Sequence, residues 1–259
     1  MQIDIYHTPQ VMGILNCTPD SFYAGSRKQT EEEILDRAEQ IIQEGATIID
    51  VGACSTRPGG EVVDEHEEMR RMRNALSIIT SHHPDAVLSI DTFRPSVAQM
   101  AVEEYGAGII NDVSEGNSEM FRTVARLKVP YILMSQQPDI NTVLQQFDGA
   151  IQELHSLGHD EVILDPGFGF GKDVVDGNFA LLNHTAKIRE AYPQLPVLAG
   201  VSRKRMIWHL LDCTPQDEAA LQGTMLVNLI ALQQGATILR VHDVREAVNT
   251  IKVSEKSKL

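Results

Sequence analysis

The chain has 259 residues, 42% of them hydrophobic, a content typical of a globular protein that excludes a disordered chain. Its formal net charge of −14 argues against general binding to nucleic acid or to an anionic membrane, because both need a basic surface. No apolar run reaches the roughly 18 residues of a membrane span, and the N-terminus has no secretory signal pattern, so we expect a cytoplasmic protein. The cysteines, Cys17, Cys54 and Cys213, are too widely spaced to suggest a disulfide framework or a zinc site.

Short apolar runs alternate with helical patterns along the chain. The runs that predict strands are Val11–Asn16, Thr47–Val51, Ala86–Asp91, Gly108–Asn111, Pro130–Met134, Glu161–Asp165, Pro196–Ala199 and Thr237–Arg240. The intervening patterns predict helices over Glu31–Glu44, Asp64–Thr80, Pro95–Tyr105, Glu119–Leu127, Asn141–Leu157 and Asp176–Ala191. Because the runs are continuously apolar rather than alternating, they are typical of parallel strands that are covered on both faces.

The alternation of strands and helices indicates the fold class. Eight strands with helices between them favour a (β/α)8 barrel of the TIM type over a doubly wound sheet. No linker or low-complexity segment interrupts the pattern, so we expect residues 1–259 to form a single barrel domain. The active site of such a barrel lies at the C-terminal ends of its strands.

Polar side chains stand at nearly every predicted strand end. A single one would be an ordinary cap or turn residue, but the whole set converges on one mouth of a barrel. Carboxylates and an amide that suit an NH-rich heterocycle come from strands three, four and six: Asp91, Asn111 and Asp165. Basic side chains that suit a phosphate or pyrophosphate follow strands two, seven and eight: Arg57, Lys204, Arg240 and His242. We therefore expect a substrate with a heterocyclic head and a phosphorylated tail.

Motifs at these strand ends resemble those of the dihydropteroate synthase family. In chain order they are NCTPDSF (16–22), STRPGG (55–60), IDTFRP (90–95), NDVS (111–114), DPGFGFGK (165–172), GVSRK (200–204) and RVHDV (240–244). Together they cover the chain from residue 11 to about residue 248. The resemblance implies a homodimeric (β/α)8 enzyme that joins p-aminobenzoate to 6-hydroxymethyl-7,8-dihydropterin pyrophosphate. Its products would be 7,8-dihydropteroate and pyrophosphate, and its metal cofactor would be Mg²⁺.

The resemblance also implies a role for each matching residue. The pterin ring would contact Asp91, Asn111, Met134, Asp165 and Lys204. Pyrophosphate would contact Asn16, Arg57, Arg240 and His242, and Asn16 would also contact Mg²⁺. The p-aminobenzoate would contact Phe22, Thr56, Pro58 and Lys204. The catalytic residues would be Asp20, Arg57, Asp91, Asp165 and Lys204.

Three departures from the family pattern leave alternatives open. Ala24 stands where relatives have a second acidic residue in the first loop, so the role of that residue is either absent or taken over by Asp20. Ala53–Cys54 replaces a Gly–Glu pair, and Met134–Gln137 replaces a Met–His–Met type sequence. The alternatives are a pterin-dependent methyltransferase of the corrinoid type and a non-catalytic pterin-binding homologue. A methyltransferase has no pyrophosphate to bind, so the basic residues at the strand ends favour the synthase.

Overall fold

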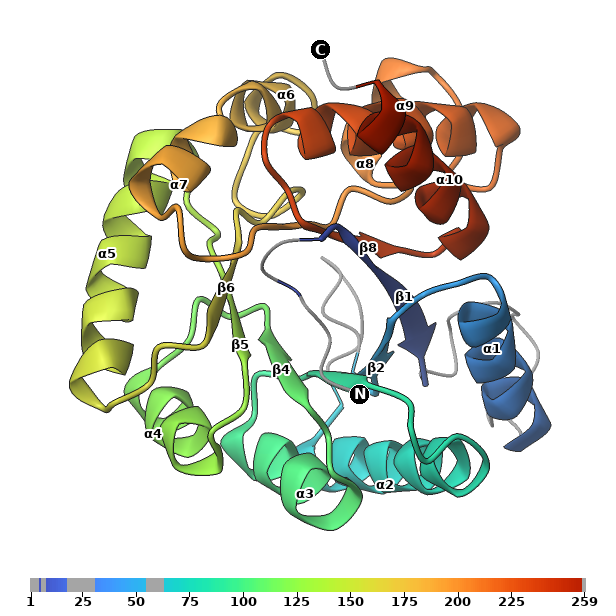
Figure 1. The fold of residues 1–259 in the computed structure, drawn as a ribbon, viewed down its shortest axis with the longest axis vertical. Coiled ribbons are helices and arrows are strands. Elements are labelled where there is room, and N and C mark those ends of the chain that lie inside the picture. The colour runs from blue at the N-terminus through green and yellow to red at the C-terminus, as the bar shows by residue number, and fades with distance from the viewer. Residues whose placement is uncertain (1–4, 6–7, 18–30, 55–62, 258–259) are drawn as a thin grey trace.

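The computed structural model describes residues 5, 8–17, 31–54 and 63–257, and its strands form one parallel sheet (Figure 1). The strands are β1 (Gln10–Asn16), β2 (Ile48–Gly52), β3 (Leu88–Asp91), β4 (Ile109–Asp112), β5 (Tyr131–Met134), β6 (Val162–Asp165), β7 (Leu198–Ala199) and β8 (Ile238–Val241). Their order is β6-β5-β4-β3-β2-β1-β8-β7, and an isolated parallel bridge between Leu164 and Val197 links β6 to the residue before β7. The sheet therefore closes, which confirms the predicted (β/α)8 barrel.

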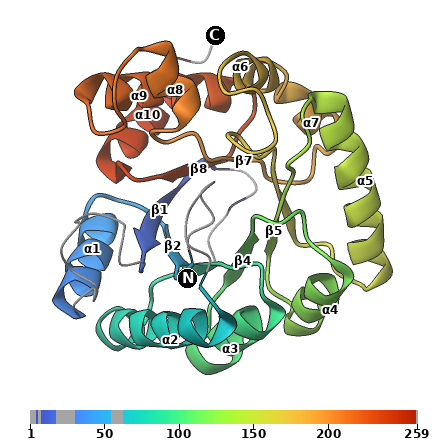
Figure 2. The same cartoon turned by 180° about the vertical axis from the view of Figure 1, so that it is seen from behind.

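The helices form a ring around the strands, as both views show (Figures 1 and 2). They are α1 (Glu31–Gln43), α2 (Glu65–His82), α3 (Pro95–Tyr105), α4 (Ser118–Leu127), α5 (Ile140–Ser156), α6 (Asp176–Asn183), α7 (Ala186–Ala191), α8 (Arg205–Leu210), α9 (Glu218–Gln233) and α10 (Val244–Lys256). Within the described part of the chain, no helix is both long and apolar enough to cross a membrane.

Capping residues explain where several helices begin and end. The side chains of Asp64 and Asn117 accept backbone N–H groups at the starts of α2 and α4. Pro95 occupies the first turn of α3, where no N–H is needed, and Gly106 ends that helix with a left-handed φ of 69°. These boundaries lie within two residues of the predicted ones, because the capping residues are visible in the sequence.

The single helix predicted over Asp176–Ala191 is wrong, because the structure divides it into α6 and α7. At the break, the N–H groups of His184 and Thr185 bond to carbonyls three residues back, at Leu181 and Leu182. The Thr185 hydroxyl also donates to the Leu181 carbonyl at 3.1 Å. A side chain that bonds to the backbone in this way competes with the regular helical ladder, and here the ladder is interrupted.

The inside of the barrel changes from aliphatic to polar along the strands. Its lower layer is an aliphatic cluster: Ile5, Met12, Ile48, Ile109, Ile132, Ile163, Leu198 and Ile238. Side chains on one face of a strand recur every second residue, so the next inward positions toward the carboxyl ends lie two residues further on. Those positions include Asp50, Asn111, Met134, Asp165 and Arg240. The predicted polar residues therefore lie next to the aliphatic layer, on its side toward the carboxyl ends of the strands.

Candidate active site

A buried carboxylate, Asp50 of β2, is the centre of a polar network inside the barrel. Arg240 donates from Nε to Asp50 Oδ2 and from Nη2 to Asp91 Oδ2, each at 2.6 Å. Ser89 donates its hydroxyl to Asp50 Oδ1 at 2.7 Å. Asn111 Nδ2 lies 3.3 Å from Oδ1 and 3.2 Å from Oδ2 of the same carboxylate. One acidic side chain thus joins residues of β3, β4 and β8 within a single layer.

Two oxygen atoms of this network are buried and have no hydrogen-bond partner among the described residues. They are Oδ1 of Asp91 and Oδ1 of Asn111. A buried oxygen that accepts no hydrogen bond costs about 1–3 kcal/mol, a cost that a ligand with N–H donors would remove. Burial also raises the pKa of Asp91 to about 7, against the opposing charge of Arg240. The two atoms together suit a ligand that presents N–H donors.

Lys204 and Asp165 form the second charged pair of the site. Burial lowers the pKa of Lys204 to about 8, although the charge of Asp165 opposes this effect. Burial raises the pKa of Asp165, and the charge of Lys204 opposes that effect in turn. The Lys204 ammonium donates to the Phe168 carbonyl and lies 4.8 Å from the centroid of the Phe170 ring. Met134, which is 1% exposed, pairs with Asp165 in the sheet and supplies an apolar wall.

The glycine-rich loop after β6 packs directly on the segment after β5. A Cβ atom added to Gly167, whose φ is +73°, would lie 1.8 Å from the Ser135 carbonyl oxygen. A Cβ atom on Gly171 would lie equally close, at 1.8 Å, to the Gln136 carbonyl oxygen. Lys172 fastens the contact by donating to the Ser135 carbonyl at 3.3 Å and to the Phe170 carbonyl at 2.9 Å. The glycines therefore allow a close backbone approach next to Asp165.

His242, which follows β8, is held from two sides. Its Nδ1 and its backbone N–H both bond to the Ser202 hydroxyl, each at 3.1 Å. Its carbonyl accepts a 2.7 Å bond from the Arg37 guanidinium of α1, which also donates to the Ile14 carbonyl of β1. The ring of His242 therefore has a fixed place beside the ends of β1 and β8.

Asn16 stands at the end of β1, next to Gly52 at the end of β2. A Cβ atom on Gly52 would lie 3.4 Å from Asn16 Oδ1 and 3.7 Å from Asp91 Oδ2. Because Gly52 has no side chain, the Asn16 amide oxygen and the Asp91 carboxylate both lie close to the position that its Cβ atom would take. Oxygen atoms of this kind are ligands for hard cations such as Mg²⁺.

The structure brings one group of predicted residues together and leaves another undescribed. The residues that lie together in the polar layer inside the barrel, or at the carboxyl ends of its strands (the rim), are Asn16, Asp91, Asn111, Met134, Asp165, Lys204, Arg240 and His242. The residues that lie outside the described part of the chain are Asp20, Phe22, Thr56, Arg57 and Pro58. The guanidinium of Arg240, which the sequence predicts to suit a phosphate or pyrophosphate, is bonded in this structure to the carboxylates of Asp50 and Asp91.

Sequence reasoning missed three residues that hold the site together. Asp50 is the penultimate residue of a predicted strand, but the pattern does not show that it bonds to Asn111 and Arg240. Lys172 ends the glycine-rich motif without a visible partner, since that partner is a backbone carbonyl. Arg37 falls on a predicted helix, where a charged residue is normally solvated. The only usable signal was for Asp50, an acidic residue within an aliphatic run.

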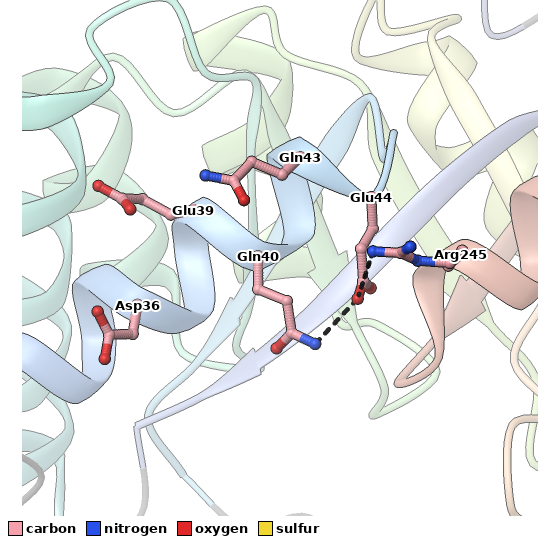
Figure 3. Close-up of a pocket in the computed structure, with 6 residues that line it drawn as sticks. All are labelled: Asp36, Glu39, Gln40, Gln43, Glu44 and Arg245. Atoms are coloured by element: carbon pink, nitrogen blue, oxygen red, sulfur yellow. Dashed lines mark hydrogen bonds and ion pairs between the residues drawn. The ribbon is translucent and has the colours of Figure 1, made fainter.

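A separate pocket lies on the outside of the barrel, between α1 and the start of α10 (Figure 3). It is lined by Asp36, Glu39, Gln40, Gln43, Glu44 and Arg245. Gln40 donates to Glu44 at 3.0 Å, and Arg245 lies 3.9 Å from the same carboxylate. Glu44 thus contacts both Gln40 and Arg245, and no lining residue of this pocket belongs to the predicted site. No cluster of three His, Cys, Asp or Glu residues suited to a metal ion occurs in the described ranges.

Comparisons with known proteins agree with this geometry. The family described as "Pterin binding enzyme" matches residues 12–242. Dihydropteroate synthase of Bacillus subtilis (strain 168) is 38% identical over 257 residues, which cover 95% of this chain and 87% of that protein.

Solved structures give the same result. Dihydropteroate synthase from Clostridium difficile, crystallised in the presence of pteroic acid, superposes with a TM-score of 0.90 at 30% identity and covers 99% of both chains. The Xanthomonas albilineans dihydropteroate synthase in complex with 7,8-dihydropteroate has a TM-score of 0.85 at 35% identity, over 98% of this chain and 95% of that one.

Proposed function

The chain belongs to the family of pterin-binding enzymes, and we propose that it acts as a dihydropteroate synthase. Its substrates are 6-hydroxymethyl-7,8-dihydropterin pyrophosphate and p-aminobenzoate, and its products are 7,8-dihydropteroate and pyrophosphate. The observation that carries the proposal is the pair of buried, unpartnered oxygens on Asp91 and Asn111. A dihydropterin ring carries several N–H groups along its edge, so it can donate to both oxygens at once.

The other residues of the layer fit a ring of this shape. Asp165 offers a second carboxylate to N–H donors, and the Lys204 ammonium offers donors to the ring's carbonyl and nitrogen acceptors. Met134 contributes an apolar surface for the flat ring. Asp91, Asn111, Met134, Asp165 and Lys204 therefore form the pterin site of the proposed enzyme.

The chemistry follows from the charges of these side chains. When the bond between the pterin methylene carbon and the pyrophosphate oxygen breaks, the electron pair leaves with the oxygen and positive charge spreads into the ring. The carboxylates of Asp91 and Asp165 stabilise that charge. The nitrogen lone pair of p-aminobenzoate then forms the new C–N bond, and the nitrogen loses a proton to solvent. An arylamine is neutral and nucleophilic near pH 7, so no Ser–His–Asp arrangement is needed.

The departing pyrophosphate binds at the rim of the barrel. His242 and Asn16 stand there beside the ends of β8 and β1, and Arg57 joins them in the proposal. Arg240 reaches the same rim from the inner layer, where it is bonded to Asp50 and Asp91. These groups bind and orient the leaving group, and the positive charges of Arg57 and Arg240 stabilise the negative charge that develops on it.

A Mg²⁺ ion fits this rim as a cofactor. The ion prefers oxygen ligands and is commonly bound by one or two protein groups together with substrate phosphates. The Asn16 amide oxygen, which lies 3.4 Å from the position of a Cβ atom on Gly52, supplies one such group. When bound, the ion would neutralise charge on the pyrophosphate.

The proposal also covers the p-aminobenzoate site, the oligomeric state and the location of the enzyme. Phe22, Thr56, Pro58 and Lys204 bind p-aminobenzoate, and Asp20 and Arg57 complete the catalytic set. We also propose a homodimer, because α8 and α9 expose Leu210 and Leu226, with 56% and 64% of their surfaces accessible. We place the enzyme in the cytoplasm, since its charged pyrophosphate substrate does not cross membranes unaided.

An activity test separates the synthase from both alternatives. Purified protein is incubated with the pterin pyrophosphate, p-aminobenzoate and Mg²⁺, and pyrophosphate release is followed with and without the acceptor. Acceptor-dependent release supports the synthase. Transfer of a methyl group from methyltetrahydrofolate to a cobalamin acceptor would instead identify a methyltransferase. Pterin binding without turnover would identify a non-catalytic binding protein.

A further inference from the structure

Asp50 controls the site through other residues. Its side chain is completely buried beneath the rim, where Ser89, Asn111 and Arg240 donate hydrogen bonds to it. Arginine remains protonated and can only donate hydrogen bonds, so the Asp50 carboxylate facing it acts as an acceptor. Every hydrogen bond that the described residues make with the Asp50 side chain has this direction.

This direction decides how the Asn111 amide is turned. An amide has one end that donates and one end that accepts, and the two ends have nearly the same shape. Because Asp50 accepts, Asn111 must present Nδ2 to it, at 3.2–3.3 Å. The acceptor end, Oδ1, is thereby left buried and without a partner in the described part of the chain.

The same carboxylate also fixes the neighbouring acceptor. Arg240 binds Asp50 Oδ2 through Nε and Asp91 Oδ2 through Nη2, so one guanidinium holds both carboxylates in place. Asp91 then keeps only Oδ1 for a ligand. The orientation of both unpartnered acceptor atoms is therefore fixed by hydrogen bonds to Asp50, directly for Asn111 and through Arg240 for Asp91.

We propose, on the basis of the function proposed above, that Asp50 is a positioning residue that makes the site select a pterin edge rich in N–H donors. By turning the Asn111 amide, it presents two acceptors to the ring and rejects an edge that presents acceptors itself. A pterin carries a 2-amino group, which donates, whereas the corresponding lumazine carries a 2-oxo group, which accepts. The ratio of affinities for these two rings measures the role of Asp50.

The test compares the binding of 6-hydroxymethylpterin and 6-hydroxymethyllumazine to four proteins by titration calorimetry. The wild type should prefer the pterin. Asp50→Asn lets the amide at position 111 turn and donate, so the preference should fall by at least about tenfold. Ser89→Ala is the matched control: it removes one bond to Asp50 but leaves Asn111 and Arg240 in place, so the wild-type ratio should persist.

The double variant Asp50→Asn/Asn111→Asp provides a rescue. It restores a carboxylate–amide pair with the two groups exchanged, and the carboxylate at position 111 again offers an acceptor to the ring. The preference for the pterin should return to within about threefold of the wild type. A loss of global stability alone would not produce this recovery. If Asp50→Asn does not fold, the double variant and the Ser89 control decide the question.

Three results would overturn the proposal: an unchanged ratio in folded Asp50→Asn, a ratio that the double variant does not restore, or a loss in Ser89→Ala equal to that in Asp50→Asn. Turnover by the wild type is measured in parallel. If the wild type forms dihydropteroate while the ratio does not depend on Asp50, the enzyme function stands and the role of Asp50 is refuted. If the wild type neither binds the pterin nor turns over, the proposed function itself fails.

Discussion

Arg240 donates from Nη2 to Asp91 Oδ2 at 2.6 Å, so a residue predicted to bind pyrophosphate is bonded to one predicted to bind the pterin. Removing the guanidinium leaves two nearly buried carboxylates, Asp50 and Asp91, without their cation. Breaking such a pair costs roughly 3–5 kcal/mol. Arg240→Met should therefore lower both thermal stability and kcat/KM.

Arg240→Lys is the informative partner of that variant. It keeps the charge but cannot bond to both carboxylates with a planar fork, so it should recover stability better than kcat/KM. Thermal unfolding and steady-state kinetics on both variants measure this difference. A methionine variant with wild-type kcat/KM would show that Arg240 has no role in either half of the site.

Two buried groups predict how activity depends on pH. The pKa of Asp91 is raised to about 7, so below that pH the side chain takes up a proton and loses acceptor capacity. The pKa of Lys204 is lowered to about 8, so above that pH the ammonium loses its charge. The value of kcat/KM for the pterin substrate should therefore be highest between about pH 7 and pH 8 and fall on both sides.

Two substitutions identify the group that causes kcat/KM to fall at high pH, the alkaline limb of the profile. Lys204→Arg stays protonated and should move the limb to higher pH, whatever it does to the maximal rate. Lys172 also has a pKa lowered to about 8 by burial, so Lys172→Arg is the control. If the limb moves in the Lys172 variant alone, the fall in kcat/KM at high pH is due to Lys172 and not to Lys204.

The close contact between Gly167 and Ser135 predicts a position where even one carbon is not tolerated. Gly167→Ala adds a Cβ atom 1.8 Å from a carbonyl oxygen, and its φ of +73° is strained for alanine. Gly106 has a φ of +69° but open space around it. Gly106→Ala should lose stability only, whereas Gly167→Ala should also lower kcat/KM, by up to about 100-fold, because the loop beside Asp165 must shift. Equal kinetics in the two variants would contradict this view of the loop.

Exposed leucines of α8 and α9 predict the surface that joins two copies of the chain. Leu211, at the end of α8, packs on Gly223 of α9, one turn before the exposed Leu226. Leu226→Glu should weaken a two-fold dimer by about 100-fold or more, since each side chain is buried twice. Leu157→Glu, at the end of α5, should leave the dimer intact (Figure 1). Sedimentation of the wild type as a 28.7 kDa monomer would refute the dimer.

Much of the inner layer was predictable from the sequence. Asp91, Asn111 and Asp165 each close an apolar run, and parallel strands of a barrel carry their ends to one mouth. The bonding partners of the Arg240 guanidinium were not predictable from the sequence. They lie on β2 and β3, which are separated from β8 by β1 in the sheet. The break at His184 was hidden as well, since an apolar helical pattern continues through it. Local patterns thus locate side chains on a barrel, whereas pairing between strands depends on the closed sheet.

The most direct test of the central claim is a single time course in which 7,8-dihydropteroate and pyrophosphate are both quantified. Purified protein is given the pterin pyrophosphate and p-aminobenzoate, with Mg²⁺ or with a chelator. The account predicts equal amounts of the two products with Mg²⁺ and a large loss of both with the chelator. Pyrophosphate without dihydropteroate, or no product despite tight pterin binding, would contradict it.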